Sequence, residues 1–242
     1  MTKVLFIDYD NTLHDSDAKY APKLDGTYGL SAEELIEAFI YVHRRIVHRQ
    51  YPDKHDDFQF HQRLLSDHLK RPYDEEEAAA TARKFAEAQQ ACWTDPVFFP
   101  DSLGFLRKAA ATHTLCLTTG DYAREKADAL EKAFGRNYFT HIFDNTHLGI
   151  KGGSEYFENA LASTGAHPDE VVAIGDSLEH DIAAASGAGI ATVWINRRGR
   201  PIPPEATPPD YEASDLFDVL NYLTSSCPGP SHCPPDSSTD QP

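Results

Sequence analysis

The 242-residue chain has no apolar run of membrane-spanning length, few cysteines and little basic charge. A membrane helix needs about 20 consecutive apolar residues, so no span is predicted. The 22 Lys and Arg stand against 38 Asp and Glu, giving a formal net charge of -16. This balance argues against a nucleic-acid binder and against an anionic membrane surface, since both attract basic proteins. Four cysteines are too few for a dense disulfide framework, and a strand begins near Lys3, where a signal peptide would lie. We therefore expect a cytoplasmic protein in a reducing setting.

Hydrophobic residues make up 40% and charged residues 25% of the chain, which is typical of a globular protein with a sizeable core. Short apolar runs predict strands over Val4–Ile7, 114–117, His141–Phe143, 171–174 and Ala191–Ile195. Helical patterns between most of them cover 101–111, 122–134, 154–163 and 180–186. Strands that alternate with helices predict an α/β fold, a Rossmann-like parallel sheet flanked by helices.

Residues 14–95 interrupt this alternation, because they contain three helix-like stretches and no convincing strand. The first follows a capping box from Ser31 to Glu34, the second covers 57–69, and the third runs over 74–93. We interpret 14–95 as an inserted all-helical cap domain, and 1–13 with 96–224 as the core. Residues 225–242 are rich in Pro, Ser and Asp and are expected to be a disordered tail.

The stretch FIDYDNTLH, residues 6–14, places Asp8 and Asp10 directly after the first strand. Acidic residues are poor strand formers and costly to bury unpaired. At this spacing both side chains project to one side if the strand continues, at the carboxyl end of a parallel strand, where open α/β sheets bind ligands. Two carboxylates so close repel each other, so either one is protonated or a cation lies between them. The alternative is an exposed acidic turn.

A second acidic turn follows the strand over 171–174, in the sequence VVAIGDSLEHD. Gly175 allows a tight exit and close backbone approach, and Asp176 again projects from a strand's carboxyl end. Asp8, Asp10 and Asp176 together would form a hard oxygen site suited to Mg²⁺. Asp181, on the following helix, either buttresses this site or a neighbouring lysine, or is a solvated helix residue.

Two weaker elements fit the same edge of the predicted sheet. The strand in LCLTTGD ends in Thr118, Thr119 and Gly120, where a hydroxyl and backbone N–H groups can hold phosphoryl oxygens; the alternative is an ordinary turn. Lys151, in GIKGGSEYF, precedes a helix and can neutralise a phosphate or a transition-state charge. Its alternative is a surface lysine.

In this order, FIDYDNTL, LTTG, the lone Lys151 and GDSLEHD resemble the motifs of the haloacid dehalogenase-like (HAD) hydrolase superfamily. The helical insertion resembles the family's cap at the same location. The resemblance implies that Asp8 is a nucleophile that forms an aspartyl-phosphate and that Asp10 is a general acid, then a base. It implies that Thr118 and Lys151 hold the phosphoryl group.

The resemblance also implies a Mg²⁺ site made by Asp8, the backbone carbonyl of Asp10, and Asp176. The activity it implies is Mg²⁺-dependent hydrolysis of a small phosphomonoester, such as a nucleotide or a sugar phosphate. Dehalogenases of the family lack a second Asp two residues after the nucleophile, so Asp10 favours a phosphatase. A phosphomutase on the same core and a non-catalytic protein that binds phosphorylated metabolites stay open as alternatives, as do the substrate and the oligomeric state. Gly152 departs from the pattern, because the family often has Pro after this lysine.

The predicted cap contains the basic stretch VHRRIVHRQ, residues 42–50. Arg44, Arg45 and Arg49 are candidates to grip an anionic part of the substrate, and Arg45 is taken as the representative. The alternative is a solvated helix face, or pairing with acids across the domain interface. Three further histidines, His55, His61 and His68, show no ligand spacing and are expected at the surface.

Cysteine and tryptophan positions divide between the expected core and the expected tail. Cys116 lies in a strand and Trp194 ends another, so both are expected in the core. Cys227 and Cys233 flank a Pro-Gly-Pro-Ser-His segment. A metal clip needs more ligands than two cysteines and one histidine, so we assign both cysteines to the tail.

Overall fold

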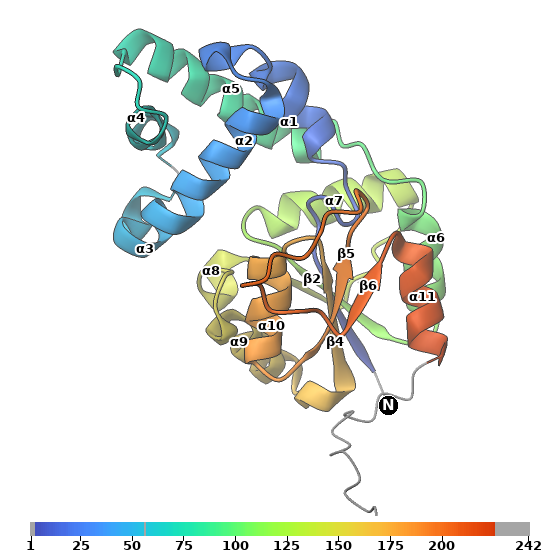
Figure 1. Ribbon diagram of the computed structural model, residues 1–242. Helices are drawn as coiled ribbons and strands as arrows, with labels where there is room; N and C mark the ends of the chain where they lie inside the picture. The colour runs from blue at the N-terminus through green and yellow to red at the C-terminus, as the bar shows by residue number, and fades with distance from the viewer. Residues whose placement is uncertain (1–2, 56, 226–242) are drawn as a thin grey trace, which may run out of the picture.

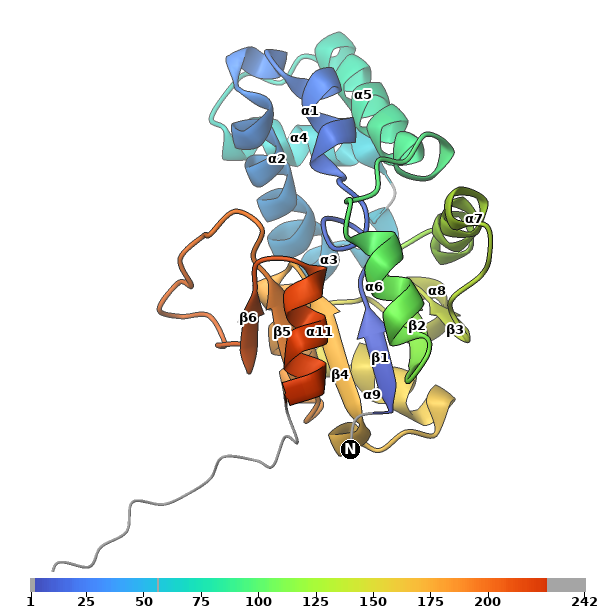
Figure 2. The ribbon, with the colours of Figure 1, turned by 90° about the vertical axis from the view of Figure 1, so that its right-hand side faces the viewer.

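A six-stranded parallel sheet lies at the centre of the computed structural model, which describes residues 3–55 and 57–225. The strand order is β3-β2-β1-β4-β5-β6 (Figures 1 and 2, with all six strands labelled in Figure 2). The strands are β1 (Val4–Ile7), β2 (Thr114–Thr118), β3 (His141–Phe143), β4 (Val171–Gly175), β5 (Ala191–Ile195) and β6 (Tyr211–Ala213). The predicted α/β sheet is confirmed. Only β6 was not predicted, because its sequence, Tyr-Glu-Ala, contains no apolar run.

The central strand β1 is in register with both neighbours, since Leu5 pairs with Leu115 of β2 and with Val172 of β4. Alternate side chains point to opposite faces of the sheet. Leu5 and Ile7 therefore pack on one face, against α6 (Ser102–Ala109), α7 (Ala123–Phe134) and α11 (Leu216–Ser225). Phe6 packs on the other face, against α9 (Ser154–Thr164) and α10 (Ala184–Gly187). Burial on both faces explains why the strands are continuous apolar runs.

Between β1 and α6 the chain forms a separate helical layer, which we call the helical module (residues 17–94). Its helices are α1 (Asp17–Leu24), α2 (Ala32–Tyr41), α3 (His48–Gln50), α4 (Phe58–His68) and α5 (Glu75–Thr94), with short turns at Thr27–Gly29, Val42–Val47 and Pro52–Lys54. It has its own core, in which the rings of Phe39 and Phe85 lie 4.1 Å apart. Figures 1 and 2 show the module on the side of the sheet toward which β1 and β4 run.

Most local predictions in this module are confirmed. The Ser31 hydroxyl accepts a hydrogen bond from the Glu34 backbone N–H, and the Glu34 carboxylate accepts one from the Ser31 N–H, as a capping box requires. The predicted helices over 57–69 and 74–93 correspond to α4 and α5. Helix α1 was not predicted, because Pro22 lies inside it and proline disfavours a helix interior.

The remaining segments are short or irregular. The predicted helix over 180–186 is a π-type turn (Leu178–Ala183) followed by α10. The remaining short helices are α8 (Asn145–Leu148) and a turn at Pro168–Glu170. Ser225 belongs to α11, while residues 226–242, with Cys227 and Cys233, lie outside the described residues.

Cys116 and Trp194 are buried, as predicted. Within the described residues, no helix combines the length and the apolar character of a membrane span.

Candidate active site

The carboxyl ends of β1, β2 and β4 bring the predicted site residues together. Ile7 pairs with Leu117 and with Ile174, so the residues that follow each strand emerge side by side. The backbone N–H of Asp8 donates to the carbonyl of Ile174 over 2.9 Å, which fixes Asp8 beside the end of β4. The Asp8 side chain is only 9% exposed.

Lys151 connects two of the acids and one strand end. Its Nζ lies 2.6 Å from Asp8 Oδ1 and 2.6 Å from Asp181 Oδ1, and donates to the carbonyl of Thr118 over 2.9 Å. Burial opposes the charge on this lysine, but the carboxylates of Asp181 and Asp8 outweigh burial and raise its pKa. Lys151 is therefore a buried permanent cation beside the candidate nucleophile.

The carboxylates crowd one another. One oxygen each of Asp8, Asp176 and Asp181 lies within 4.8 Å of the others. Burial, opposed by Lys151 and assisted by repulsion from Asp181 and Asp10, raises the pKa of Asp8 to about 7. Burial and repulsion from Asp8 and Asp181 raise the pKa of Asp176 well above its usual range. A divalent cation between Asp8 and Asp176 would offset this repulsion, and all-oxygen ligands suit Mg²⁺. Both oxygens of Asp181 are engaged, Oδ1 by Lys151 and Oδ2 by the Ser177 N–H, whereas Lys151 contacts only Oδ1 of Asp8. The residues therefore fit such an ion with Asp8 and Asp176 as the side-chain ligands.

Gly175 makes this packing possible. A Cβ atom built on Gly175 would lie 2.2 Å from Cγ of Asp181, so any side chain there would displace the carboxylate. Asp181 Oδ2 also accepts a hydrogen bond of 3.0 Å from the Ser177 backbone N–H. The glycine after β4 thus lets Asp181 lie against the strand end and hold the following turn.

Asp10 has different neighbours from Asp8. Its Oδ2 accepts a 2.7 Å hydrogen bond from Lys126 Nζ, and its Oδ1 accepts one of 2.6 Å from the Ser16 hydroxyl. Burial opposes ionisation of Asp10, but Lys126 and Ser16 outweigh it and lower its pKa. Lys126 also donates to the Thr119 hydroxyl over 2.8 Å. The hydroxyl attached to this charged network is therefore that of Thr119, while Thr118 contributes its carbonyl to Lys151.

Sequence reasoning missed Lys126. The signal was present: Ala123, Lys126, Ala127 and Leu130 share the buried face of α7, so a lysine occupies a position where the helical period calls for an apolar residue. A charge at such a position needs a partner, and Asp10 is that partner.

The loop around Lys151 is held from two sides. The Lys151 backbone N–H donates a 2.8 Å hydrogen bond to Asn145 Oδ1. The Lys151 carbonyl accepts a 2.6 Å hydrogen bond from His180 Nδ1. A Cβ on Gly152 would lie 3.1 Å from the His180 ring. The glycine that replaces the family's usual proline therefore gives His180 room to fasten this loop.

The three arginines of the basic stretch separate into two groups. Arg45 and Arg49 are exposed and form ion pairs with Glu179 at 3.2 Å and 3.6 Å. This matches the alternative interpretation of the basic stretch, in which its charges pair with acids across the interface between the helical module and the core. Arg44 donates to the Ser177 hydroxyl over 3.3 Å. Ser177 directly follows Asp176, so Arg44 is the arginine that the structure brings to the carboxylates.

A cavity of about 1040 Å³ lies between the helical module and the sheet. Its lining includes residues of the sheet domain (Asp8, Asp10, Gly120, Lys126, Lys151 and Asp176) and Arg44 of the helical module. The carboxylate cluster is thus open to a space large enough for a small metabolite.

The prediction for the three scattered histidines was partly wrong. His68 is exposed, as expected, but His61 is fully buried and His55 is half-buried. His61 packs against Phe39, with ring centroids 5.4 Å apart, in the core of the helical module. The sequence positions of His55 and His61 did not indicate their burial, because that burial depends on how the helices of the module pack together.

These features agree with comparisons to known proteins. Residues 2–189 match the haloacid dehalogenase-like hydrolase family, and the chain belongs to that family. Phosphoserine phosphatase of Thermus thermophilus is 32% identical over 148 residues, which are 59% of this chain and 58% of that protein. N-acylneuraminate-9-phosphatase of Homo sapiens is 28% identical over 178 residues, 67% of this chain and 68% of that protein. The chain thus spans little more than half the length of the first of these relatives.

Solved structures share the fold. The HAD-hydrolase YfnB of Bacillus subtilis, determined bound to magnesium, has a TM-score of 0.67 at 19% identity and covers 92% of this chain and 98% of that chain. The L-2-haloacid dehalogenase of Xanthobacter autotrophicus has a TM-score of 0.65 at 16% identity, and the match covers 93% of this chain and 99% of that chain. Likeness at these identities establishes a common architecture, and the choice of reaction depends on the site.

Proposed function

We propose that this chain is a Mg²⁺-dependent phosphatase that hydrolyses a small phosphomonoester through an aspartyl-phosphate on Asp8. The observation that carries the proposal is the convergence of Asp8, Lys151 and Asp176 at the edge of one cavity, with Lys151 Nζ 2.6 Å from Asp8 Oδ1. The curated relatives named above are phosphatases, which supports the same reaction class.

Asp8 is the nucleophile in this proposal. Its carboxylate forms a bond to phosphorus as the bond to the ester oxygen breaks. Lys151 holds one Asp8 oxygen and offsets the repulsion between an anionic carboxylate and an anionic phosphate. Mg²⁺, held by Asp8, Asp176 and the Asp10 carbonyl, would add positive charge for the same purpose.

Asp10 handles the proton in both steps. It protonates the departing alkoxide, then takes a proton from the water that attacks the aspartyl-phosphate, which releases phosphate and restores Asp8. The hydrogen bonds from Lys126 and Ser16 keep Asp10 ionised, which is the form the second step needs. We infer that the phosphate of the substrate attracts Lys126 away from Asp10, so that Asp10 can be protonated for the first step.

The remaining contacts come from both sides of the cavity. In this proposal Gly120 and Lys126, which both line the cavity, hold phosphoryl oxygens, and the buried Thr119 hydroxyl positions Lys126. The helical module acts as the cap, which excludes bulk water from the site. We assign substrate contact to Arg44 in place of Arg45, because Arg45 is engaged by Glu179. A capped cavity favours a small metabolite over a folded phosphoprotein.

A phosphate-release screen tests this function. The full chain would be assayed with sugar phosphates, nucleotides and phosphorylated acids, in Mg²⁺ and in EDTA. We expect release that requires Mg²⁺, and a loss of about 10⁴-fold or more in kcat for Asp8→Asn. Asp169→Asn is the matched control, since that side chain is 79% exposed and remote from the cavity.

Several outcomes would contradict the proposal. Wild-type turnover in Asp8→Asn would remove the nucleophile assignment. Isomerised sugar phosphate with little free phosphate would indicate a mutase, and halide release from 2-haloacids a dehalogenase. Ligand binding without turnover across the panel would indicate a non-catalytic protein.

A further inference from the structure

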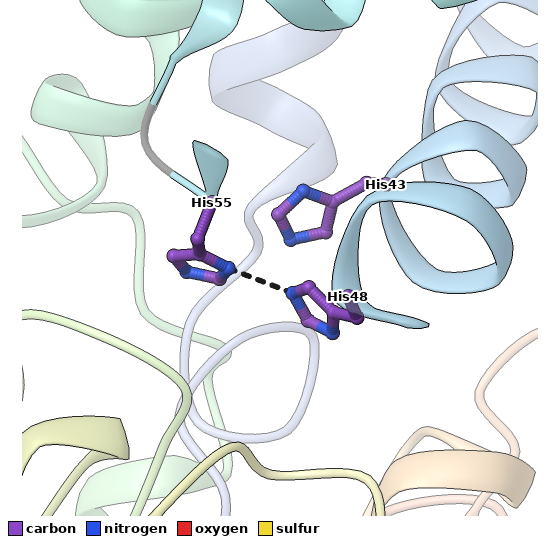
Figure 3. Close-up of side chains that lie close together, drawn as sticks. All are labelled: His43, His48 and His55. Atoms are coloured by element: carbon purple, nitrogen blue, oxygen red, sulfur yellow. Dashed lines mark hydrogen bonds between the residues drawn. The ribbon is translucent and has the colours of Figure 1, made fainter. Parts of the chain in front are cut away.

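Three histidines of the helical module face one another at the wall of the cavity. One ring nitrogen each of His43, His48 and His55 lies within 4.8 Å of the other two. The ring centroids are 4.3 Å apart for His43 and His48, 4.9 Å for His43 and His55, and 4.7 Å for His48 and His55 (Figure 3). All three line the same cavity as the carboxylates.

A local departure from the α-helix creates this arrangement. His43 and His48 are five residues apart, and in an α-helix they would point about 140° away from each other. Here the segment Val42–Val47 is a π-type turn, and the His48 backbone N–H donates to the carbonyl of His43. This five-residue hydrogen bond brings both rings to the same face. Single π turns inside helices occur often at functional sites.

Hydrogen bonds outside the cluster orient two of the rings. His55 Nε2 lies 2.8 Å from Asp121 Oδ2, and since a carboxylate only accepts, Nε2 carries the proton and Nδ1 faces His48. His61 Nδ1 donates to the carbonyl of Asp57 over 2.7 Å. In that neutral tautomer, His61 Nε2 accepts from His43 Nδ1 over 2.9 Å, which leaves the lone pair of His43 on Nε2. Metal-bound histidines are typically oriented by such partners.

We propose that His43, His48 and His55 bind a divalent transition-metal ion of the Zn²⁺ class, separate from the Mg²⁺ site of the carboxylates. Neutral imidazole suits Zn²⁺, Cu²⁺ and Ni²⁺, whereas Mg²⁺ prefers oxygen. Three protein ligands leave a fourth position for water or a group of the substrate. His48 Nε2 and His55 Nδ1 are now 2.8 Å apart. Two nitrogens on one tetrahedral Zn²⁺ are about 3.3 Å apart. Because His55 Nδ1 is the acceptor in this contact, His48 Nε2 is the donor, so binding the ion requires a small ring rotation and a shift of the His48 proton from Nε2 to Nδ1.

The charge state of the rings agrees with this use. Burial and the neighbouring histidines lower the pKa of His43, and burial with His55 and Arg44 lowers the pKa of His48 to about 4. Both rings are therefore neutral near pH 7, with lone pairs available to a metal. Arg44 adds unfavourable positive charge nearby, and Asp121 compensates with a negative charge on the outer side of His55.

The same contacts would connect the ion to the catalytic loop. Asp121 lies between β2 and α7, and its Oδ1 accepts a 3.1 Å hydrogen bond from Asn145 Nδ2. Asn145 Oδ1 in turn accepts from the Lys151 backbone N–H over 2.8 Å. A metal that fixes His55 would therefore fasten the helical module to the loop that carries Lys151, which gives the ion a means to hold the module closed.

The test is a Zn²⁺ titration by calorimetry of the EDTA-stripped full chain, in excess Mg²⁺ to occupy the carboxylates. We expect one Zn²⁺ per chain, a dissociation constant about 100-fold or more weaker in His48→Gln and in His55→Gln, and a loss of about 10-fold in Asp121→Asn. His68→Gln, an exposed histidine of the same module, should bind as the wild type does. In the wild type, Co²⁺ should give the visible spectrum of a four-coordinate nitrogen site, and Zn²⁺ at about 100 times its dissociation constant should raise Tm by about 5–10 °C.

The proposal is overturned if the wild type binds no stoichiometric Zn²⁺ or if Co²⁺ gives an octahedral, oxygen-type spectrum. It is also overturned if Asp176→Asn, and neither histidine variant, removes Zn²⁺ binding, or if His68→Gln weakens binding as much as His48→Gln does. The wild-type spectrum and Tm decide the question even if a histidine variant fails to fold. None of these readouts requires phosphatase activity.

Discussion

The two polar clusters that face the cavity are built in different ways. The carboxylates of Asp8 and Asp176 follow adjacent parallel strands, and the register of β1 with β4 brings them together. The imidazoles of His43, His48 and His55 come from an irregular stretch of the helical module, where a π turn and a short loop decide which way each ring points. The register of a parallel sheet allows the neighbours at a strand end to be predicted from sequence, whereas the histidine cluster depends on a π turn and on tertiary contacts.

The clusters also differ in charge. The carboxylates hold negative charge that burial penalises, and Lys151 and Lys126 offset part of it. Burial lowers the pKa of His43 and of His48, which favours their neutral, metal-binding form. One cluster is therefore suited to a hard cation and an attack on phosphorus, and the other to a softer ion that holds the module in place. If the two clusters act separately, a substitution in one should leave the function of the other unchanged.

Among the substitutions that test whether the two clusters are separate, the largest effect is expected from Lys126→Met, which removes the cation beside Asp10 and Thr119 while keeping an unbranched side chain of similar length. We expect kcat to fall by about 10–100-fold, because a charge-assisted contact to the phosphoryl group and the orientation of Asp10 are both lost. Zn²⁺ binding measured by calorimetry should stay as in the wild type. Lys132→Met, an exposed position on the same helix, is the control. A normal kcat in Lys126→Met would show that this lysine is structural, and a loss of Zn²⁺ binding would show that the clusters are not separate.

A smaller effect is expected from Arg44→Ala, which acts at the boundary between the clusters. Arg44 contacts Ser177, next to Asp176, whereas Arg45 is exposed and paired with Glu179. We expect KM for phosphomonoesters to rise about 10-fold in Arg44→Ala with little change in kcat, since a contact to bound substrate is lost in both ground and transition states.

Arg45→Ala provides the matched comparison and should stay within about 2-fold of the wild type, because exposed ion pairs contribute little. Steady-state kinetics of the two variants measures the difference. An equal rise in KM in both variants would mean that the basic stretch acts through its overall positive charge. A larger rise in Arg45→Ala than in Arg44→Ala would identify Arg45 as the binding residue.

How far the sequence allowed prediction follows from the same contrast. The apolar runs located β1 to β5, and the acids after β1 and β4 were found because strand ends of a parallel sheet meet at one edge. Lys126 was missed because a lysine on a helix is usually solvated, and its burial appears only once α7 is packed against the site.

The histidine positions were beyond pattern reasoning for a further reason. The spacing between His43 and His48 indicates opposite faces under the α-helical period, and only the π turn reverses that conclusion. His55 joins them through a loop whose direction is set by its contact with Asp121. Tertiary contacts, and not local propensity, therefore decide this cluster.

The smallest expected effect concerns Asp144, which supports the segment between the clusters. Its carboxylate accepts hydrogen bonds from the backbone N–H groups of Ala123 and Thr146 and thereby begins α7 and α8 beside Asp121 and Asn145. Burial opposes ionisation of Asp144, but hydrogen bonds from the Thr146 hydroxyl, the Ala123 N–H, the His147 ring and the Thr146 N–H outweigh it and lower its pKa from the usual value. Asp144→Asn should reduce the free energy of unfolding at pH 7 by about 1–2 kcal/mol, because neutral acceptors bind more weakly than ionised ones.

The sign of the pH dependence distinguishes this cause from a loss of packing. Because the folded pKa of Asp144 lies below the unfolded value, its contribution is complete above about pH 4 and is lost as pH falls through the folded pKa. The gap between Asp144→Asn and the wild type should therefore be constant from pH 7 to about 5 and narrow below pH 4. Denaturant unfolding across this range measures it, with Asp128→Asn, an exposed residue of α7, as the control. A gap that stays constant down to pH 3 would mean that the asparagine disturbs the packing, and the charge on Asp144 would then have no part in holding the loop between the two clusters.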